Sequence, residues 1–173
     1  PALLARGRAR LFEADPTGQF AGKILDELPR GVRDGLDDLR KLPYSLEALR
    51  WRRDYETVEI SPHLDRRGWA DLFAAEQPER ALALMQAEIE VRHDDVSRIT
   101  LAWTMYHAKK EGYKQVAEQA MARNCPEPRL IHHAAVMYQD GSLARRALAG
   151  GAGLTASERQ ELLALVALAT ATP

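Results

Sequence analysis

The stretch "ITLAWTMYHAKKEGYKQVAEQAMARN", residues 99–124, decides the fold of this chain. It contains two apolar patterns of helical period, separated by Gly112, a residue type suited to a tight turn. On a helical wheel, residues 96–111 carry apolar side chains on two broad arcs, one of which holds Trp103 and Tyr106. A helix that is apolar on two sides packs against two neighbours. The stretch therefore predicts two consecutive helices within a stack, with both aromatic rings in its core.

The composition is that of a globular protein of one domain or a short repeat array. Of the 173 residues, 46% are apolar and 28% are charged, and the net charge of −1 gives no overall attraction to nucleic acid or an acidic membrane. The single cysteine, Cys125, excludes an internal disulfide and a multi-cysteine metal site, and a cytoplasmic setting is expected. No apolar run is long enough to span a bilayer, so membrane insertion is not expected. Richness in arginine and alanine is typical of bacterial coding bias.

Helical patterning covers most of the chain, and proline and glycine residues separate its segments. The expected helices are 2–14, 19–28, 32–42, 45–54, 64–75, 78–92, 95–111, 113–124, 129–139, 142–149 and 159–171. The alternating stretch 55–60 has no partner strand and is interpreted as an extended connector. The glycines of "GGAG", residues 150–153, are interpreted as a hinge, and Thr155 with Glu158 forms a capping box before the last helix.

These segments divide the chain into three parts. Residues 1–60 are expected to form an irregular helical N-terminal region, residues 61–150 a set of helical hairpin repeats, and residues 151–173 a C-terminal capping helix. The last helix is very apolar. It is expected either to cap the array or to dock onto another surface, which includes self-association with a second copy of the chain.

A repeat supports this division. The segments "PERALALMQAE" and "YKQVAEQAMAR" both read as the second helix of a pair, and their alanines Ala81 and Ala117 lie 36 residues apart, as do their methionines. A period of about 34 residues with two helices per unit is typical of tetratricopeptide repeats. The segment 64–149, which includes "LAWTMYHAKKEGYKQVAEQA" and "RLIHHAAVMYQDGSLARRAL", resembles degenerate repeats of this family. It departs from the family pattern at Met105, where a small residue is expected, and in its short last unit.

The resemblance implies an all-α fold of stacked antiparallel hairpins, a right-handed superhelix that binds a protein or peptide partner on its concave face. A polar stripe on the first helix of the central pair would then face the groove, together with the equivalent face of the next unit. The candidate partner-binding residues are Ser97, Thr100, Thr104, His107, Glu111, Arg129, His132 and His133. The alternative interpretation of these residues is an ordinary solvated surface.

A metal site built from the histidines and Cys125 is not expected, because the adjacent His132 and His133 point about 100° apart on a helix. No phosphate-binding or nucleophile motif occurs, since "GGAG" lacks the lysine that a P-loop requires. The sequence therefore predicts no cofactor, no metal and no catalytic residue. Enzyme status would instead appear as a deep pocket with converging titratable groups and shifted pKa values.

A second class of function rests on the cluster Arg50, Trp51, Arg52 and Arg53, in which arginines surround an aromatic ring as they do on nucleic-acid-binding surfaces. Acidic residues flank the cluster, and arginines also pair with carboxylates within helical proteins. Nucleic-acid binding is therefore the less favoured alternative. A helical regulatory module and a non-catalytic subunit of an enzyme complex stay open beside the interaction scaffold.

Overall fold

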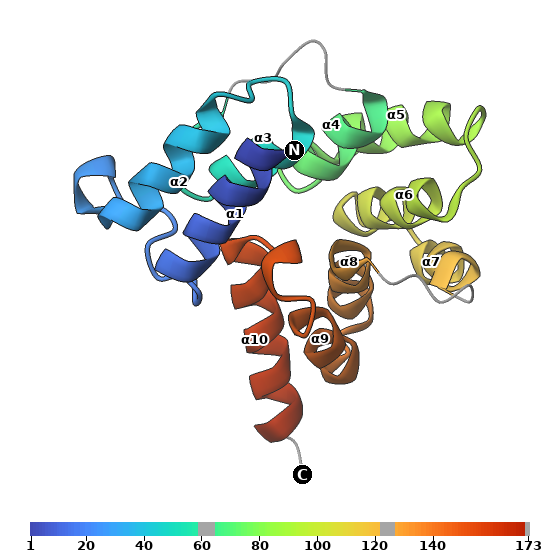
Figure 1. Cartoon of the computed structure of the whole chain (residues 1–173). Coiled ribbons are helices and arrows are strands. Elements are labelled where there is room, and N and C mark those ends of the chain that lie inside the picture. The colour runs from blue at the N-terminus through green and yellow to red at the C-terminus, as the bar shows by residue number, and fades with distance from the viewer. Residues whose placement is uncertain (59–64, 122–126, 172–173) are drawn as a thin grey trace.

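The computed structural model describes residues 1–58, 65–121 and 127–171. Within these ranges the chain forms ten α-helices, two short 3-10 helices and no β-strand, which confirms the expected all-α class (Figure 1). The helices are α1 (Ala2–Ala14), η1 (Leu25–Glu27), α2 (Arg30–Arg40), α3 (Leu46–Arg52), α4 (Arg66–Phe73), α5 (Pro78–Ile89), α6 (Asp95–His107), α7 (Tyr113–Met121), α8 (Pro128–Tyr138), α9 (Gly141–Leu148), η2 (Gly151–Gly153) and α10 (Ala156–Ala171). None of the helices in the described ranges combines the length and apolar character that crossing a bilayer requires.

The first three α-helices share a core of their own. Helices α1 and α2 approach closely, since a Cβ added to Gly7 would lie 2.7 Å from a methyl carbon of Leu39. The helix expected at 19–28 is wrong, because Gly18 and Gly22 both adopt positive φ and turn the backbone out of the helical path. Only η1 remains of it. The connector expected at 55–60 contains no strand in its described part, while residues 59 and 60, like Cys125, lie outside the described ranges.

The following helices pack in consecutive pairs, α4 with α5, α6 with α7 and α8 with α9. Helices α4, α6 and α8 also contact one another in order and form an inner row, while α5, α7 and α9 lie outside it along an arc (Figure 1). Trp103 on α6 is buried in the largest hydrophobic cluster, as the sequence predicted, whereas Tyr106 is only partly buried and packs against that cluster. Helix α6 ends at His107 rather than at residue 111, because Lys109 adopts a left-handed conformation with φ of 55°.

Helix α10 joins the two parts of the molecule. It packs on α8 and α9, and Arg159 donates hydrogen bonds to the backbone oxygens of Asp15 (2.7 Å) and Pro16 (2.9 Å), directly after α1. Thr155 and Glu158 form the expected capping box, with the Thr155 N–H donating to Glu158 Oε2 at 2.8 Å. The stretch interpreted as a hinge, 150–153, contains η2, and its glycines Gly150 and Gly153 lie against Pro128. The last helix is therefore held against the chain after α1 at one end and against α8 and α9 along its length.

Candidate functional site

A polar pocket of about 340 Å³ lies where α3, α4, α6, α8 and α10 meet. The pocket forms at this place because α10 packs on α8 and α9 and is also bonded to α3 through Arg50 and Glu158. The end of α3 therefore lies opposite the inner row. The residues that line it are Arg50, Arg53, Asp54, Asp71, Leu72, Ala75, Trp103, His107, His132, His133, Thr155, Ser157, Glu158 and Glu161. Most of these side chains are charged or titratable, so the electrostatics of the pocket decide what it can do.

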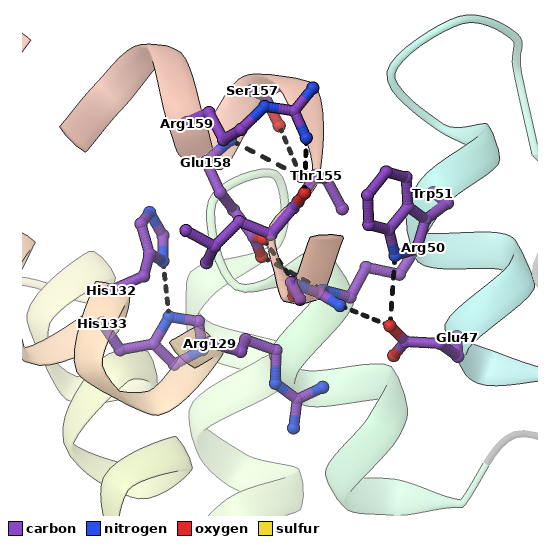
Figure 2. A network of polar contacts seen from close by, with 12 residues as sticks. Glu47, Arg50, Trp51, Arg129, His132, His133, Thr155, Ser157, Glu158 and Arg159 are labelled. Atoms are coloured by element: carbon purple, nitrogen blue, oxygen red, sulfur yellow. Dashed lines mark hydrogen bonds and ion pairs between the residues drawn. The ribbon is translucent and has the colours of Figure 1, made fainter. Parts of the chain in front are cut away.

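A buried ion pair crosses the pocket from α3 to α10. The side chain of Arg50 is 6% exposed and donates to Glu158 Oε2 (2.5 Å), Glu47 Oε1 (2.7 Å) and the Gly153 oxygen (3.1 Å) (Figure 2). Burial by itself would lower the pKa of Arg50, but the carboxylates of Glu158 and Glu47 outweigh it, so the net pKa is raised. Burial would likewise raise the pKa of Glu158, whereas Arg50 and His132 lower it to about 2. Both groups are charged at neutral pH.

Two adjacent histidines on α8 form the second feature of the pocket. His132 and His133 contact each other through their Nδ1 atoms, 3.1 Å apart, as the dashed line in Figure 2 shows. Their outer Nε2 atoms each meet a carboxylate, Glu161 of α10 at 2.7 Å from His132 and Asp71 of α4 at 2.6 Å from His133. The second oxygen of Asp71 pairs with Arg129 at 2.9 Å. A continuous hydrogen-bonded chain thus joins α10, α8 and α4.

This chain fixes the number of protons on the two rings. Burial opposes the ionisation of both carboxylates, but Arg129 and His133 lower the net pKa of Asp71, and His132 lowers that of Glu161. An ionised carboxylate only accepts hydrogen bonds, so both Nε2 atoms donate. The two Nδ1 atoms then share one further proton, because two lone pairs at 3.1 Å would repel each other.

Trp103 fixes the position of the pair. Its ring stacks on His133 with the ring centres 4.2 Å apart and the planes 4° from parallel, and His107 contacts Trp103 edge-on at 4.3 Å. Burial is the largest cause of the lowered pKa of His133, and the Asp71 carboxylate only partly offsets it.

Three of the predicted groove residues do not face a groove. Ser97, Thr100 and Thr104 are fully buried, because α6 is covered on that side by its neighbours. The hydroxyls of Thr100 and Thr104 donate to carbonyl oxygens of their own helix, at Val96 and Leu101, each at 2.8 Å. A threonine that bonds to its own helix can be buried without leaving a polar group unsatisfied. The polar stripe was therefore a wrong indication of an open surface at these positions.

The other predicted groove residues divide into two groups. His107, His132 and His133 line the pocket, whereas Arg129 lies behind it, paired with Asp71, and Glu111 is exposed beyond the end of α6. The expectation that the two adjacent histidines stay apart is wrong. Both Nε2 atoms are anchored to carboxylates on other helices, which holds the inner nitrogen atoms together.

The arginine cluster of α3 does not form a stacking surface for nucleic acid. Trp51 is fully buried in the N-terminal core, and Arg50 lies in the ion pair across the pocket. Arg52 pairs with Glu56, and Arg53 donates to the Leu72 oxygen and Glu76. The acidic residues near the cluster in sequence and in space neutralise it, which corrects the nucleic-acid alternative for these four residues.

Sequence reasoning missed the carboxylates of the pocket. Asp71 stands 62 residues before its histidine partner, and Glu161 stands 29 residues after its own. Neither distance leaves a local pattern, and Glu158 was recognised only as a helix cap. In the described ranges, no group of three or more potential metal ligands is arranged around a common point.

Comparison of the chain with models of protein families, with curated proteins and with solved structures found no match.

The histidines of the pocket predict a fall in stability on the acid side of neutrality. Burial lowers the folded-state pKa of both His133 and His107 below the ordinary value of 6.5. As pH falls below about 6.5, the unfolded chain takes up protons that these folded histidines refuse, so the free energy of unfolding decreases. We expect urea titrations at pH 7 and pH 5 to show this decrease.

A second decrease is expected at lower pH. The depressed pKa of Glu158 stabilises the folded chain above about pH 4.5, and this stabilisation is lost as pH falls towards about 2.

Two variants test the decrease in stability between pH 7 and pH 5. The variant His133→Gln, which keeps a donor to Asp71 but does not titrate, should reduce that decrease. The variant His93→Gln, at an exposed histidine, should not change it. Equal stability of the unmodified protein at pH 7 and pH 5 would contradict the lowered pKa values of His107 and His133.

Proposed function

We propose that this chain is a protein-interaction module that binds a peptide or protein partner at the polar pocket, on the side formed by α4, α6 and α8. The observation that carries the proposal is a pocket in which interhelical ion pairs fix the walls while Glu161, with a side chain 49% exposed, stays open to a partner. A pre-organised site binds with less loss of conformational entropy than a flexible one. The single cysteine supports a cytoplasmic location for this role.

A repeat period supports a tetratricopeptide-like arrangement of α4 to α9. Trp69 on α4, Trp103 on α6 and Met137 on α8 follow one another at intervals of 34 residues, and all three are buried. On the outer helices, Ala81 of α5 and Ala117 of α7 are both fully buried. Equivalent positions that repeat and pack are what stacked helical pairs require, and such stacks use their inner face for binding.

The pocket meets part of the description expected of an enzyme, since titratable groups with shifted pKa values converge in it. Of the four carboxylates that line the pocket, three have pKa shifts whose direction favours binding, whereas burial raises the pKa of the fourth, Asp54. Asp71, Glu158 and Glu161 all have lowered pKa values, so none of them holds a proton at neutral pH for general acid catalysis. The hydroxyl of Ser157 donates to Asp54 at 2.7 Å, and no histidine is hydrogen-bonded to it in the described structure.

Obstruction of the pocket tests this function. Ala75 is exposed, follows α4 and lines the pocket, so a tryptophan there would occupy its space without removing any ion pair. We expect a library of displayed random peptides to yield peptides that bind the unmodified protein. Ala75→Trp should weaken their binding by about tenfold or more, equivalent to about 1.4 kcal/mol. Dissociation constants from fluorescence anisotropy provide the measurement.

The matched control is Ala83→Trp, the same substitution at an exposed position of α5 on the outer row. This variant should bind the selected peptides as the unmodified protein does. Both variants should unfold at the temperature of the parent, since neither position is buried. Failure to select any peptide, or equal binding by the Ala75 and Ala83 variants, would refute the proposed function.

A further inference from the structure

We propose that the pocket accepts a positively charged side chain of the partner, a lysine or an arginine, which contacts Glu161 and His107. This inference rests on the proposed function and specifies its ligand chemistry. It follows from the polar atoms of the pocket that have no partner and from the balance of charge around them.

The guanidinium groups around the pocket are already paired. Arg50 donates to two carboxylates and a backbone oxygen, and Arg53 donates to the Leu72 oxygen and to Glu76. Arg129 pairs with Asp71 at 2.9 Å. An incoming anion would have to compete with these internal carboxylates for every cation, at the cost of leaving a charge unpaired.

Two acceptors of the pocket are available instead. In the described structure Glu161 makes its hydrogen bond through Oε2, to His132, which leaves Oε1 for a donor from outside. The Nε2 atom of His107 is buried and has no hydrogen-bond partner among the described residues. The pKa of His107 is lowered, chiefly by burial, so this ring is neutral at neutral pH and one of its nitrogen atoms can accept. Free acceptors of this kind call for a donor.

The charge balance requires that donor to be a cation. Four guanidiniums, of Arg8, Arg50, Arg53 and Arg129, stand against seven carboxylates that pair with them or line the pocket, so the network has an excess of negative charge. The carboxylates are Glu47, Asp54, Asp71, Glu76, Glu127, Glu158 and Glu161. In a pocket of low dielectric such an excess attracts a cation more strongly than it would in water.

The size of the pocket fits one side chain. A volume of about 340 Å³ is at the lower end of the range for small-molecule sites, of roughly 300 to 1,000 Å³. A long aliphatic stem could pass Leu72 and Ala75 at the wall, and its charged end could reach Glu161 and His107. A peptide backbone would then remain outside, along the inner row of helices.

The experiment uses simple cations as probes. Cadaverine and agmatine carry the charged groups of lysine and arginine, glutarate is an anion of similar length, and 1-pentanol is neutral. Each is titrated into protein labelled with ¹⁵N, and the signals of the Trp103 indole and the histidine rings are followed. We expect both cations to shift these signals in a saturable manner, and glutarate and 1-pentanol to leave them unchanged.

Variants assign the cation to its acceptors. Glu161→Gln should weaken cation binding by about tenfold, the effect of losing one hydrogen bond to a charged group. His107→Leu should also weaken it, and this variant leaves the bond between Glu161 and His132 in place. Glu90→Gln, at an exposed carboxylate after α5, is the matched control and should bind as the parent does.

Two kinds of result would overturn the inference: saturable shifts with glutarate, or cation binding that neither Glu161→Gln nor His107→Leu weakens. The absence of any response to cadaverine and agmatine would overturn it as well. Selected peptides that need an open pocket but share no lysine or arginine would refute this inference and leave the proposed function standing. Cation binding at Glu161 without any selectable peptide would refute the function and leave the chemistry of the pocket standing.

Discussion

Replacement of Arg50 by methionine is expected to destabilise the protein by about 3–5 kcal/mol, the range found when one partner of a buried ion pair is removed. Methionine keeps much of the aliphatic bulk of Arg50 but leaves Glu158 buried without its cation. The pKa of Glu158, now about 2, should rise because burial is no longer opposed by that charge. Chemical denaturation at pH 7 measures the loss.

Two controls separate this effect from lost packing. Arg30→Met breaks an ion pair with Asp34 at the surface, where both side chains are largely exposed, and should cost at most about 0.5 kcal/mol. The double variant Arg50→Met with Glu158→Gln should lose less stability than the sum of its single variants, because no charge is left alone. Additive losses, or a loss at Arg50 no larger than at Arg30, would contradict the structural role of the buried pair.

Replacement of Trp103 by alanine is expected to cost about 3–5 kcal/mol, as large-to-small changes in a core do. Trp103 is 8% exposed, and its ring contacts Tyr106, His107, His132 and His133. Its loss would leave a cavity beside the histidine pair and disturb the inner row where α6 meets α8. Urea denaturation gives the free energy, and the imidazole signals should show whether the two histidines still share a proton.

Trp103→Phe should cost less than the alanine change, because a ring remains to stack on His133. Val91→Ala removes part of an apolar side chain that is 75% exposed and should change stability by at most about 0.5 kcal/mol. If Trp103→Ala were as stable as the parent, the packing of α6 between its neighbours would be wrong.

The periodicity of the sequence predicted the helices of the arc, because the apolar face of each helix is long enough to give a recognisable helical period. The starts at Pro78, Asp95 and Tyr113 are confirmed, and so is the burial of Trp103. The helix at 19–28 failed because no pattern of side chains shows that two glycines will adopt positive φ. The position of Pro128 against Gly150 and Gly153 was equally absent from the sequence pattern, since it depends on tertiary contact.

The candidate site was less accessible to sequence reasoning than the fold. Periodicity marked His107, His132 and His133 as polar residues on helical faces, but it could not supply Asp71 or Glu161 as their partners. Asp71 lies on α4 and Glu161 on α10, and both helices approach α8 only through tertiary packing. The stripe on α6 was misleading for a physical reason: its buried threonines donate their hydroxyls to carbonyl oxygens of the same helix, so a polar residue type does not by itself indicate contact with water.

The bonds from Arg159 to the chain after α1, and from Arg50 to α10, also bear on how such a molecule could change in evolution. Open helical arrays gain or lose whole units readily, because each unit touches only its neighbours. Insertion of one more hairpin between α7 and α8 would carry α10 away from Arg50 and from the chain after α1, and would leave the buried side chains of Glu158 and Arg159 without these partners. The number of hairpins is therefore fixed by electrostatics, and variation among descendants should be confined to substitutions and to loops on the outer side.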